Sequence, residues 1–382
     1  MMKNDKRKRV FVGMSGGVDS SVSAYLLKKA GYDVTGVFIK VWQPDFIECT
    51  WKEDRLDAMR VAAQLDIPFI TFSAEAEYKK HVVDYMIGEY MVGRTPNPDV
   101  MCNKYVKFGA FFDFAMKNGA DFVATGHYAR KGKDSRDRTQ DSRKNEKYPE
   151  SKIMNRESAN LLISTDPDKD QSYFLYQITQ KQLSKTLLPI GHLNKGDVRK
   201  IAKKAKLFTA DKKDSQGLCF IGKVDMKDFL KEFIKTKPGK VLNKNGEIVG
   251  SHDGAELYTI GQRHGFTILK KTSIESRFFV IARDVKKNTL TISDKETRQG
   301  QITGLILENL NWLSGQIPNM NKGYTCQIRY HGEYIKCRII NDNRLIKVLF
   351  DKAQDFISLG QSCVVFDNEI CLGGGIINGL LY

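Results

Sequence analysis

The sequence predicts an α/β protein in which a doubly wound parallel sheet is followed by a small linking domain and a C-terminal β-barrel. Strand and helix patterns alternate in the first part of the chain, and a glycine-rich turn joins the first strand to the first helix. From residue 278 onward, short strand-like runs follow one another between turn residues. The 382 residues suffice for these domains, which we expect at 1–222, 223–285 and 286–382.

The charge balance limits the class of protein. The chain has 61 Lys and Arg residues against 45 Asp and Glu, a formal charge of +16. This excess indicates a polyanionic partner, although a solubilising lysine-rich surface would also explain it. No apolar run is long enough to span a membrane, and the basic N-terminus lacks a signal-peptide core, so we expect a cytoplasmic protein. Seven cysteines without a Cys-x-x-Cys pair indicate free thiols rather than a zinc or iron–sulfur site.

The first strand, at 10–12, leads into Ser-Gly-Gly-Val-Asp-Ser at 15–20 and then into a helix. Adjacent glycines and a helix N-terminus together form a concavity for phosphate oxygens. Asp19 would repel a bare phosphate, so it indicates a divalent cation or an N-cap role. No Walker A lysine motif is present here. We therefore expect a nucleotide with a metal ion, the alternative being an ordinary glycine turn with a serine cap.

Strands at 34–39 and 68–72, with a helix at 54–65 between them, complete the β-α-β pattern. Ligands of such sheets lie at the carboxyl ends of the strands. Ile39 is thus placed to line an adenine pocket, although its position fits plain strand core equally well.

A loop with two prolines, at 94–103, precedes a predicted helix at 104–118. Cys102 would lie at or near the N-terminus of this helix, where a thiol pKa is lowered. Asp99 is placed to move a proton or to cap the helix. A single cysteine is more often buried filler than a nucleophile, so this pattern alone does not decide the matter.

A fourth strand at 121–125 ends in Gly126 and His127. Gly126 allows close approach of the backbone to a nucleotide. His127 would hydrogen-bond to substrate or cap the sheet. We read residues 131–158 as a charged, solvated insertion, after which 161–163 resumes the sheet.

Residues 168–175 open a further helix with acidic residues at its start, and Lys169 and Gln171 could contact a phosphate or a base. Asn194 caps a helix that runs to Leu207, and its lysine-rich side suits a nucleic-acid backbone or a solvated face. A small-residue turn at 214–221 then presents Cys219.

The strand runs from 278 to 377 indicate a closed barrel. Arg329 and Tyr330 pair a cation with a stacking ring, a combination that suits RNA, although ordinary strand alternation explains it almost as well.

Six motifs occur in one order along nearly the whole chain. They are the glycine turn at 13–20, Asn-Pro-Asp with the cysteine at 97–102, 124–128, 169–175, 217–221 and 258–263. Together they resemble the tRNA-specific 2-thiouridylase family of the PP-loop ATP pyrophosphatases. The charged insertion departs from the compact family pattern, and Ile39 stands where the family often has methionine.

The resemblance implies ATP-dependent conversion of the wobble uridine (position 34) of tRNA to 2-thiouridine, by a catalytic domain at 1–222 and an RNA-contacting barrel. ATP, with Mg²⁺, would adenylate the uracil C2 oxygen. Cys219 would then deliver sulfur as a persulfide, with Cys102 as partner thiol, and a Cys102–Cys219 disulfide would remain. Asp99 would be the acid/base.

The resemblance also implies contact residues. For the nucleotide these are Gly13, Met14, Ser15, Gly16, Gly17, Val18, Asp19, Ser20, Ile39 and Gly126. For RNA they are Asn97, Pro98, Asp99, His127, Lys169, Asp170, Gln171, Arg329, Tyr330 and Gln361. The implied partners are the anticodon loop of tRNA and a persulfide-carrying protein that donates sulfur. We expect the protein itself to be a monomer.

Cys102 and Cys219 are 117 positions apart, and a disulfide needs their Cα atoms within about 7 Å. We therefore expect one of them on a mobile segment, with the loop before Cys219 as the candidate. Two other functions fit parts of the pattern: a PP-loop ligase that adenylates a small metabolite, and an RNA-binding module with a degenerate nucleotide site.

Overall fold

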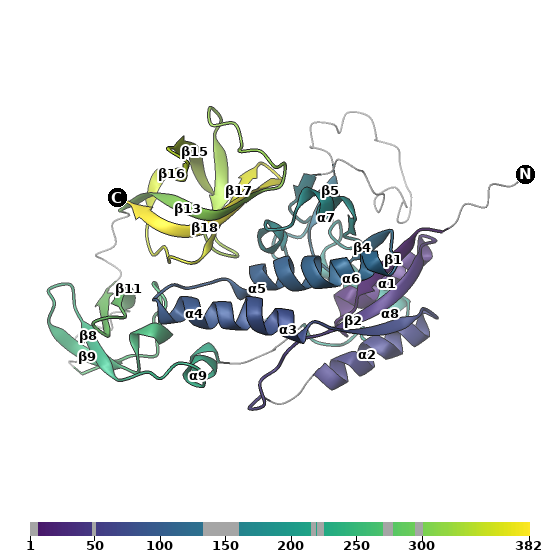
Figure 1. The fold of residues 1–382 in the computed structure, drawn as a ribbon, viewed down its shortest axis with the longest axis horizontal. Coiled ribbons are helices and arrows are strands. Elements are labelled where there is room, and N and C mark those ends of the chain that lie inside the picture. Colours follow the sequence, from purple (N-terminus) through teal and green to yellow (C-terminus); the bar gives the residue numbers. More distant parts are fainter. Residues whose placement is uncertain are drawn as a thin grey trace, which may run out of the picture.

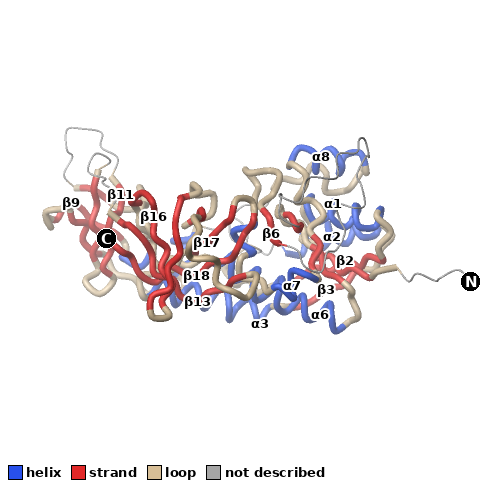
Figure 2. Tube along the Cα trace, turned by 90° about the horizontal axis from the view of Figure 1, so that it is seen from above, coloured by secondary structure: helices blue, strands red, loops and turns tan. Residues whose placement is uncertain are grey.

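The computed structural model describes residues 7–47, 51–132, 160–214, 219, 225–269, 278–294 and 301–382. Figures 1 and 2 show an elongated molecule, with the parallel sheet near one end and the barrel and a second sheet toward the other. Most of the expected charged insertion and most of the turn around Cys219 lie outside the described residues. No helix in the described ranges has the length and apolar character needed to cross a membrane.

The N-terminal sheet is wholly parallel, with the strand order β3-β2-β1-β4-β7. Its strands are β1 (Arg9–Gly13), β2 (Asp33–Lys40), β3 (Phe69–Ser73), β4 (Phe122–Ala124) and β7 (Thr186–Leu187). Strand β1 lies between β2 and β4, so the crevice of this sheet opens at the carboxyl ends of β1 and β4. The residues that follow these two ends are the glycine turn and Gly126.

Helices cover both faces of this sheet, as predicted. Alternation along β1 sends Val10 and Val12 to one face and Phe11 to the other. The first face packs against α1 (Val18–Lys29), α2 (Trp51–Gln64) and α8 (Lys195–Lys204). The second face packs against the helices between β3 and β4. This arrangement confirms the doubly wound α/β fold.

Two long helical segments connect β3 to β4. The first is α3 (Glu75–Tyr78), η1 (Lys79–Asp84) and α4 (Tyr85–Met91); the second is α5 (Pro98–Met101), η2 (Cys102–Ala110) and α6 (Phe111–Lys117). The stretches η1 and η2 are π-helical. Figure 1 shows α3 and α4 extending from the parallel sheet toward the second sheet.

The helix predicted at 104–118 begins earlier, at Pro98. The reason is an N-cap: the Val100 backbone N–H donates to Asn97 Oδ1 at 3.2 Å, and Pro98 occupies the first helical position. Cys102 therefore lies in the second turn and not at the helix N-terminus, so the expectation of a dipole-lowered thiol pKa loses its structural basis.

Strands β13 to β18 close into a barrel, because β13 pairs with both β16 and β18. Their bounds are β13 (Ile302–Trp312), β14 (Tyr324–Gln327), β15 (Ile335–Asp342), β16 (Leu345–Gln354), β17 (Ser362–Asp367) and β18 (Ile370–Leu381). The predicted barrel is confirmed from 302 onward, but the first two strand runs that we expected in it, between 278 and 293, are β11 (Phe279–Asp284) and β12 (Thr289–Ser293) of a separate central sheet.

One strand prediction was wrong. Residues 161–163 do not resume the parallel sheet: β6 (Asn160–Leu162) pairs antiparallel with β5 (Arg130–Gly132) and with β18 of the barrel. An edge of the barrel strand was available for pairing there, which local sequence cannot reveal.

The central sheet has the order β10-β9-β8-β12-β11. Its elements are β8 (Gly239–Leu242), β9 (Ile248–His252), β10 (Thr267–Ile268), β11 (Phe279–Asp284) and β12 (Thr289–Ser293), with α9 (Met226–Lys231) before them and the 3₁₀ turn η6 (Ala255–Leu257) after β9. The expected boundary between 285 and 286 would divide the β11–β12 pair, so we propose a boundary between 294 and 301.

The chain between β6 and α9 contains short elements. They are the 3₁₀ turn η5 (Ser172–Leu175), α7 (Gln180–Ser184) and β7. The expected helix at 168–175 is thus a single turn. Asn194 caps α8 as predicted, accepting from the Asp197 N–H at 2.9 Å, but α8 ends at Lys204 and not at Leu207.

Candidate active site

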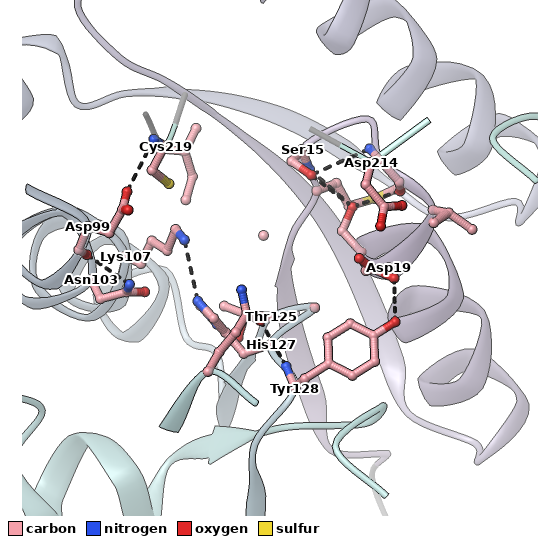
Figure 3. Close-up of a pocket in the computed structure, with 18 of the residues that line it drawn as sticks. Ser15, Asp19, Asp99, Asn103, Lys107, Thr125, His127, Tyr128, Asp214 and Cys219 are labelled. Carbon is pink, nitrogen blue, oxygen red and sulfur yellow. Dashed lines mark hydrogen bonds between the residues drawn. The ribbon is translucent and has the colours of Figure 1, made fainter. Parts of the chain in front are cut away.

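A cavity of about 600 Å³ lies at the carboxyl ends of β1 and β4. Its wall combines the glycine turn, the helix that carries Asp99, the loop after β4, and Tyr330 from the barrel. Figure 3 shows Cys219, Asp99 and Lys107 on one side, Ser15, Asp19 and Asp214 on the other, and His127 between them. Of the residues expected to contact a nucleotide, the following line it: Gly13, Met14, Ser15, Gly17, Val18, Asp19, Ser20, Ile39 and Gly126.

Two glycines shape the nucleotide end. Gly16 has φ +75°, and a Cβ there would stand 2.2 Å from the Asp54 carbonyl oxygen. Only glycine therefore lets the turn pack this closely against Asp54. A Cβ on Gly126 would stand 2.8 Å from the Ser20 nitrogen. The loop after β4 therefore packs directly on the first turn of α1. The N-cap of α1 is Gly17, which brings no capping side chain, so this end of the helix suits phosphate oxygens.

Asp19 is not the N-cap of α1, because that position belongs to Gly17. Its carboxylate accepts from Lys195 Nζ at 2.8 Å on each oxygen and from the Tyr128 hydroxyl at 2.8 Å. The Asp19 carboxylate is thus fixed at the cavity wall by an ion pair with Lys195 and a hydrogen bond from Tyr128.

Asp214 is the centre of a cluster of three cations. Its carboxylate lies 2.9 Å from Lys195 Nζ, 3.1 Å from Lys169 Nζ and 2.7 Å from the Arg199 guanidinium. Partial burial opposes ionisation of Asp214, but its hydrogen bonds with Lys195 and Lys169 outweigh that effect and lower its pKa. Cations grouped at a glycine turn complement a polyphosphate.

The basic side of α8 is therefore divided. Lys195 and Arg199 face the cavity cluster instead of a solvent-exposed RNA surface, because Asp19 and Asp214 pair with them. Lys203 remains on the outer side, 3.2 Å from Asp211. The lysine-rich side that we expected on the surface of α8 is therefore present only on the outer side of the helix, at residues such as Lys203.

The two thiols implied by the family pattern are adjacent. Cys102 donates to Cys219, with the sulfurs 3.7 Å apart. The Cys219 backbone is held from two sides: its N–H donates to Asp99 Oδ1 at 3.2 Å, and its carbonyl accepts from the Tyr78 hydroxyl at 2.7 Å. Cys102 is fully buried, whereas Cys219 lines the cavity. No rearrangement is needed to bring the sulfurs together, so the inference of a mobile segment does not follow.

The pKa of Cys102 is not lowered, as its expected place near a helix N-terminus had predicted. Burial, and then the bond to Cys219, raise the pKa of Cys102. The hydrogen bond from Cys102 lowers the pKa of Cys219 despite burial. Burial also raises the pKa of the Asp99 carboxyl. A raised carboxyl pKa beside a thiolate suits proton exchange.

Sequence reasoning missed Lys107, which lines the cavity beside the thiols. Its Nζ lies 3.4 Å from His127 Nε2, and His127 Nδ1 lies 2.7 Å from Thr125 Oγ1. Burial, and then the charge of Lys107, lower the pKa of His127, so the imidazole is neutral. Asp99, Asn103 and Lys107 are four residues apart, and residues at this spacing share a helix face. This spacing could have indicated that Lys107 lies near Asp99.

The residues expected to contact RNA separate into two groups. Those that line the cavity are Asp99, His127, Lys169, Gln171 and Tyr330. The Tyr330 ring stacks on His331, with 3.9 Å between ring centroids, and is tilted against Phe174 at 4.2 Å, so the barrel brings an aromatic wall to the site.

The others have contacts within the protein or lie outside the cavity wall. Asn97 caps α5, and Pro98 begins it. The buried Asp170 carboxylate accepts from Ser164 N–H and the Ser172 hydroxyl at 2.7 and 2.6 Å. Gln361 donates to the Thr95 and Pro96 carbonyls, which joins the barrel to the catalytic domain. Arg329 is exposed on the barrel.

Comparison with known proteins gives the family. A family model described as tRNA methyl transferase HUP domain matches residues 8–223. Models described as tRNA methyl transferase PRC-barrel domain and aminomethyltransferase beta-barrel domain match 227–294 and 302–377. A tRNA-specific 2-thiouridylase of Geobacillus kaustophilus is 44% identical over 98% of this chain and 97% of its own length. One of Alkaliphilus oremlandii is 43% identical over all of both chains. The chain belongs to the tRNA-specific 2-thiouridylase family.

Solved structures are less similar. The NMN synthetase of Francisella tularensis shares 18% identity, with a TM-score of 0.33, over 55% of this chain and 66% of its own. That degree of likeness carries no functional argument. Membership of the 2-thiouridylase family therefore rests on the full-length sequence relatives, and it agrees with a site that joins a PP-loop to a thiol pair.

Proposed function

We propose that this protein catalyses the ATP-dependent 2-thiolation of the wobble uridine, position 34, of tRNA. One observation supports this most directly: two thiols 3.7 Å apart adjoin the cavity that the PP-loop lines. A nucleotide activates an oxygen at one end of the cavity, and sulfur is supplied at the other.

The uracil C2 oxygen is a poor leaving group, so the first step transfers AMP to it. Backbone N–H groups at the start of α1 bind phosphate oxygens. Lys195, Lys169 and Arg199 offset the negative charge of the departing pyrophosphate. In this step ATP competes with the Asp19 and Asp214 carboxylates for the same cations.

Mg²⁺ commonly binds through one or two carboxylates together with substrate phosphates. Within the described residues no group of three or more His, Cys, Asp or Glu side chains could hold a metal ion. Asp19 is the PP-loop carboxylate that would hold Mg²⁺, once Lys195 turns to the phosphates. The cation would supply charge stabilisation to the leaving pyrophosphate.

In the second step the terminal sulfur of a Cys219 persulfide attacks the adenylated C2 atom, and AMP leaves with the oxygen. Cys102, deprotonated by Asp99, then attacks the Cys219 sulfur. The bond between the two persulfide sulfurs breaks, its electrons stay with the sulfur on C2, and 2-thiouridine is released. The resulting Cys102–Cys219 disulfide needs a thiol reductant before the next turnover.

The substrate uridine must leave its stack to enter the cavity, as is usual for enzymes that act on bases. The adjacent rings of Phe174 and Tyr330 line the cavity and offer a surface for it. We propose the anticodon loop of tRNA as the bound segment, a persulfide-carrying protein as the sulfur donor, and a cytoplasmic monomer as the working form.

The test incubates the protein with ATP, Mg²⁺, a persulfide donor and unmodified tRNA, followed by nucleoside mass analysis. We expect 2-thiouridine with the wild type and none with Cys219→Ser, which should still release pyrophosphate. Cys371→Ala, which removes a buried barrel thiol, is the control for general loss of a cysteine. Product from Cys219→Ser, or none from the wild type, would contradict the proposal. The latter result would favour a small-metabolite ligase or an RNA-binding module.

A further inference from the structure

Lys107 lies beside the thiol pair in the cavity wall, and no step of the proposed reaction assigns it a role. It belongs to the π-helical stretch η2, which begins at Cys102. Pairing of i to i+5 in a π-helix aligns residues five apart, so Lys107 follows Cys102 by one wide turn. Such irregular turns are frequent at functional sites. A regular α-helix would rotate Lys107 further from Cys102.

Among the described titratable groups whose charge acts on the thiols, only Lys107 is positively charged. Burial keeps the pKa of the Tyr78 hydroxyl well above its usual value, so that group is neutral. His127 is neutral as well, and Asp99 can only add negative charge. Lys107 lines the same cavity as Cys219, and its charge favours the thiolate form of both cysteines.

The Lys107 ammonium is held in place. It donates to His127 Nε2 at 3.4 Å, and the opposite ring nitrogen lies 2.7 Å from Thr125 Oγ1. A neutral imidazole that accepts at Nε2 carries its proton on Nδ1, so the ring donates to Thr125. Figure 3 shows this chain between the thiol and nucleotide ends of the cavity.

We propose that Lys107 is a positioning residue for the sulfur-transfer step: its ammonium places the negative charge of the thiol pair on Cys219. The direction of the thiol hydrogen bond agrees, because Cys102 is the donor and Cys219 the acceptor. Exposure agrees too, because Cys219 lines the cavity and Cys102 is fully buried.

The charge on Cys219 serves the loading reaction, and this step rests on the proposed function. The Cys219 thiolate attacks the terminal sulfur of a donor persulfide, R–S–SH. The donor S–S bond breaks, R–S⁻ leaves with the bond electrons, and Cys219–S–SH is formed. Lys107 then faces the persulfide proton and favours the persulfide anion that attacks C2.

The experiment measures the rate of iodoacetamide alkylation of Cys219 against pH, quantified by mass spectrometry of the peptide that contains it. Lys107→Met should raise the apparent thiol pKa by about one unit or more, and so slow alkylation at pH 7 about tenfold, since the thiolate is the nucleophile. Lys107→Arg should restore most of the rate. Lys104→Met is the matched control, because Lys104 is three residues away on η2 and donates instead to Gln177 at 3.1 Å.

The wild type provides a measurement that does not depend on the variants folding. Its Cys219 should alkylate with a midpoint below the ordinary thiol value of about 8.5, and Cys102 should resist until higher pH. An ordinary midpoint for Cys219, or a well-folded Lys107→Met with an unchanged profile, would overturn the proposal. If the profile shifts as expected but the wild type makes no 2-thiouridine, the charge assignment stands and the proposed function fails.

Discussion

The two ends of the cavity are built differently. The turn at the nucleotide end comes from one contiguous stretch, residues 13–20, and only the cations grouped around Asp214 and the loop at Gly126 are added from distant positions. The thiol end is assembled from side chains far apart in the sequence, with Cys102 and Cys219 brought into contact at 3.7 Å. A site formed by the backbone of one stretch can therefore be predicted from a sequence motif, whereas a site formed by distant side chains depends on packing between elements.

The largest effect should come from Gly16→Ala. The new Cβ meets the Asp54 carbonyl oxygen at 2.2 Å, and the backbone has φ +75°, so the turn must move. We expect at least about a 100-fold loss of ATP affinity, equal to about 2.7 kcal/mol, measured by isothermal titration calorimetry. Gly31→Ala is the matched control: its φ is +85°, but no heavy atom lies within 4 Å of the added Cβ. Equal losses in both variants would show that backbone strain alone, and not the turn, is responsible.

Lys195→Met should have the next largest effect. It removes the shared partner of Asp19 and Asp214 and leaves their carboxylates facing each other and the phosphates. We expect about a tenfold or greater rise in the KM for ATP, with little change in alkylation of Cys219. Lys200→Met, on the same helix and paired only with Asp197 at 3.1 Å, is the control. A normal KM in Lys195→Met would remove this lysine from the phosphate site.

Asp99→Asn should separate activity from stability at the thiol end. The folded-state pKa of Asp99 is raised, so the protonated carboxyl contributes stability below the unfolded-state pKa, and that contribution is lost as pH rises through the folded-state value. The amide still accepts from the Cys219 N–H but carries no charge. We therefore expect a higher melting temperature than the wild type at pH 7, no gain at pH 3, and much slower thiolation. A lower melting temperature at pH 7 would contradict the raised pKa.

The smallest effect concerns the outer side of α8. If Lys203 and Lys204 contact phosphates of single-stranded RNA, replacing both with Gln should reduce the log-log salt slope of tRNA binding by up to about 1.4, at about 0.7 per contact. Lys352→Gln, on the exposed surface of the barrel, is the control. An unchanged slope would leave this side of α8 as solvated surface.

The parts that sequence predicted well are local. The apolar runs of β1 and β2, the glycine turn and the Asn194 cap are each decided by neighbouring residues, and the structure has them where expected. The parts that sequence missed depend on distant partners. Nothing in the neighbourhood of Leu161 indicates that β6 pairs with the barrel, and nothing near Lys195 indicates that Asp19 draws it inward. The expectation of a lowered pKa for Cys102 failed for a similar reason, because burial and the contact with the distant Cys219 raise that pKa.

The pairing of β6 with β18 has a consequence for how the molecule can be divided. A strand of the ATP-binding domain completes hydrogen bonding along Ile370 and Cys371 of the last barrel strand. A barrel expressed alone would present that unpaired edge to other chains and would tend to aggregate. The parallel-sheet domain and the barrel are thus joined by main-chain hydrogen bonds, and separating them would expose unpaired strand edges.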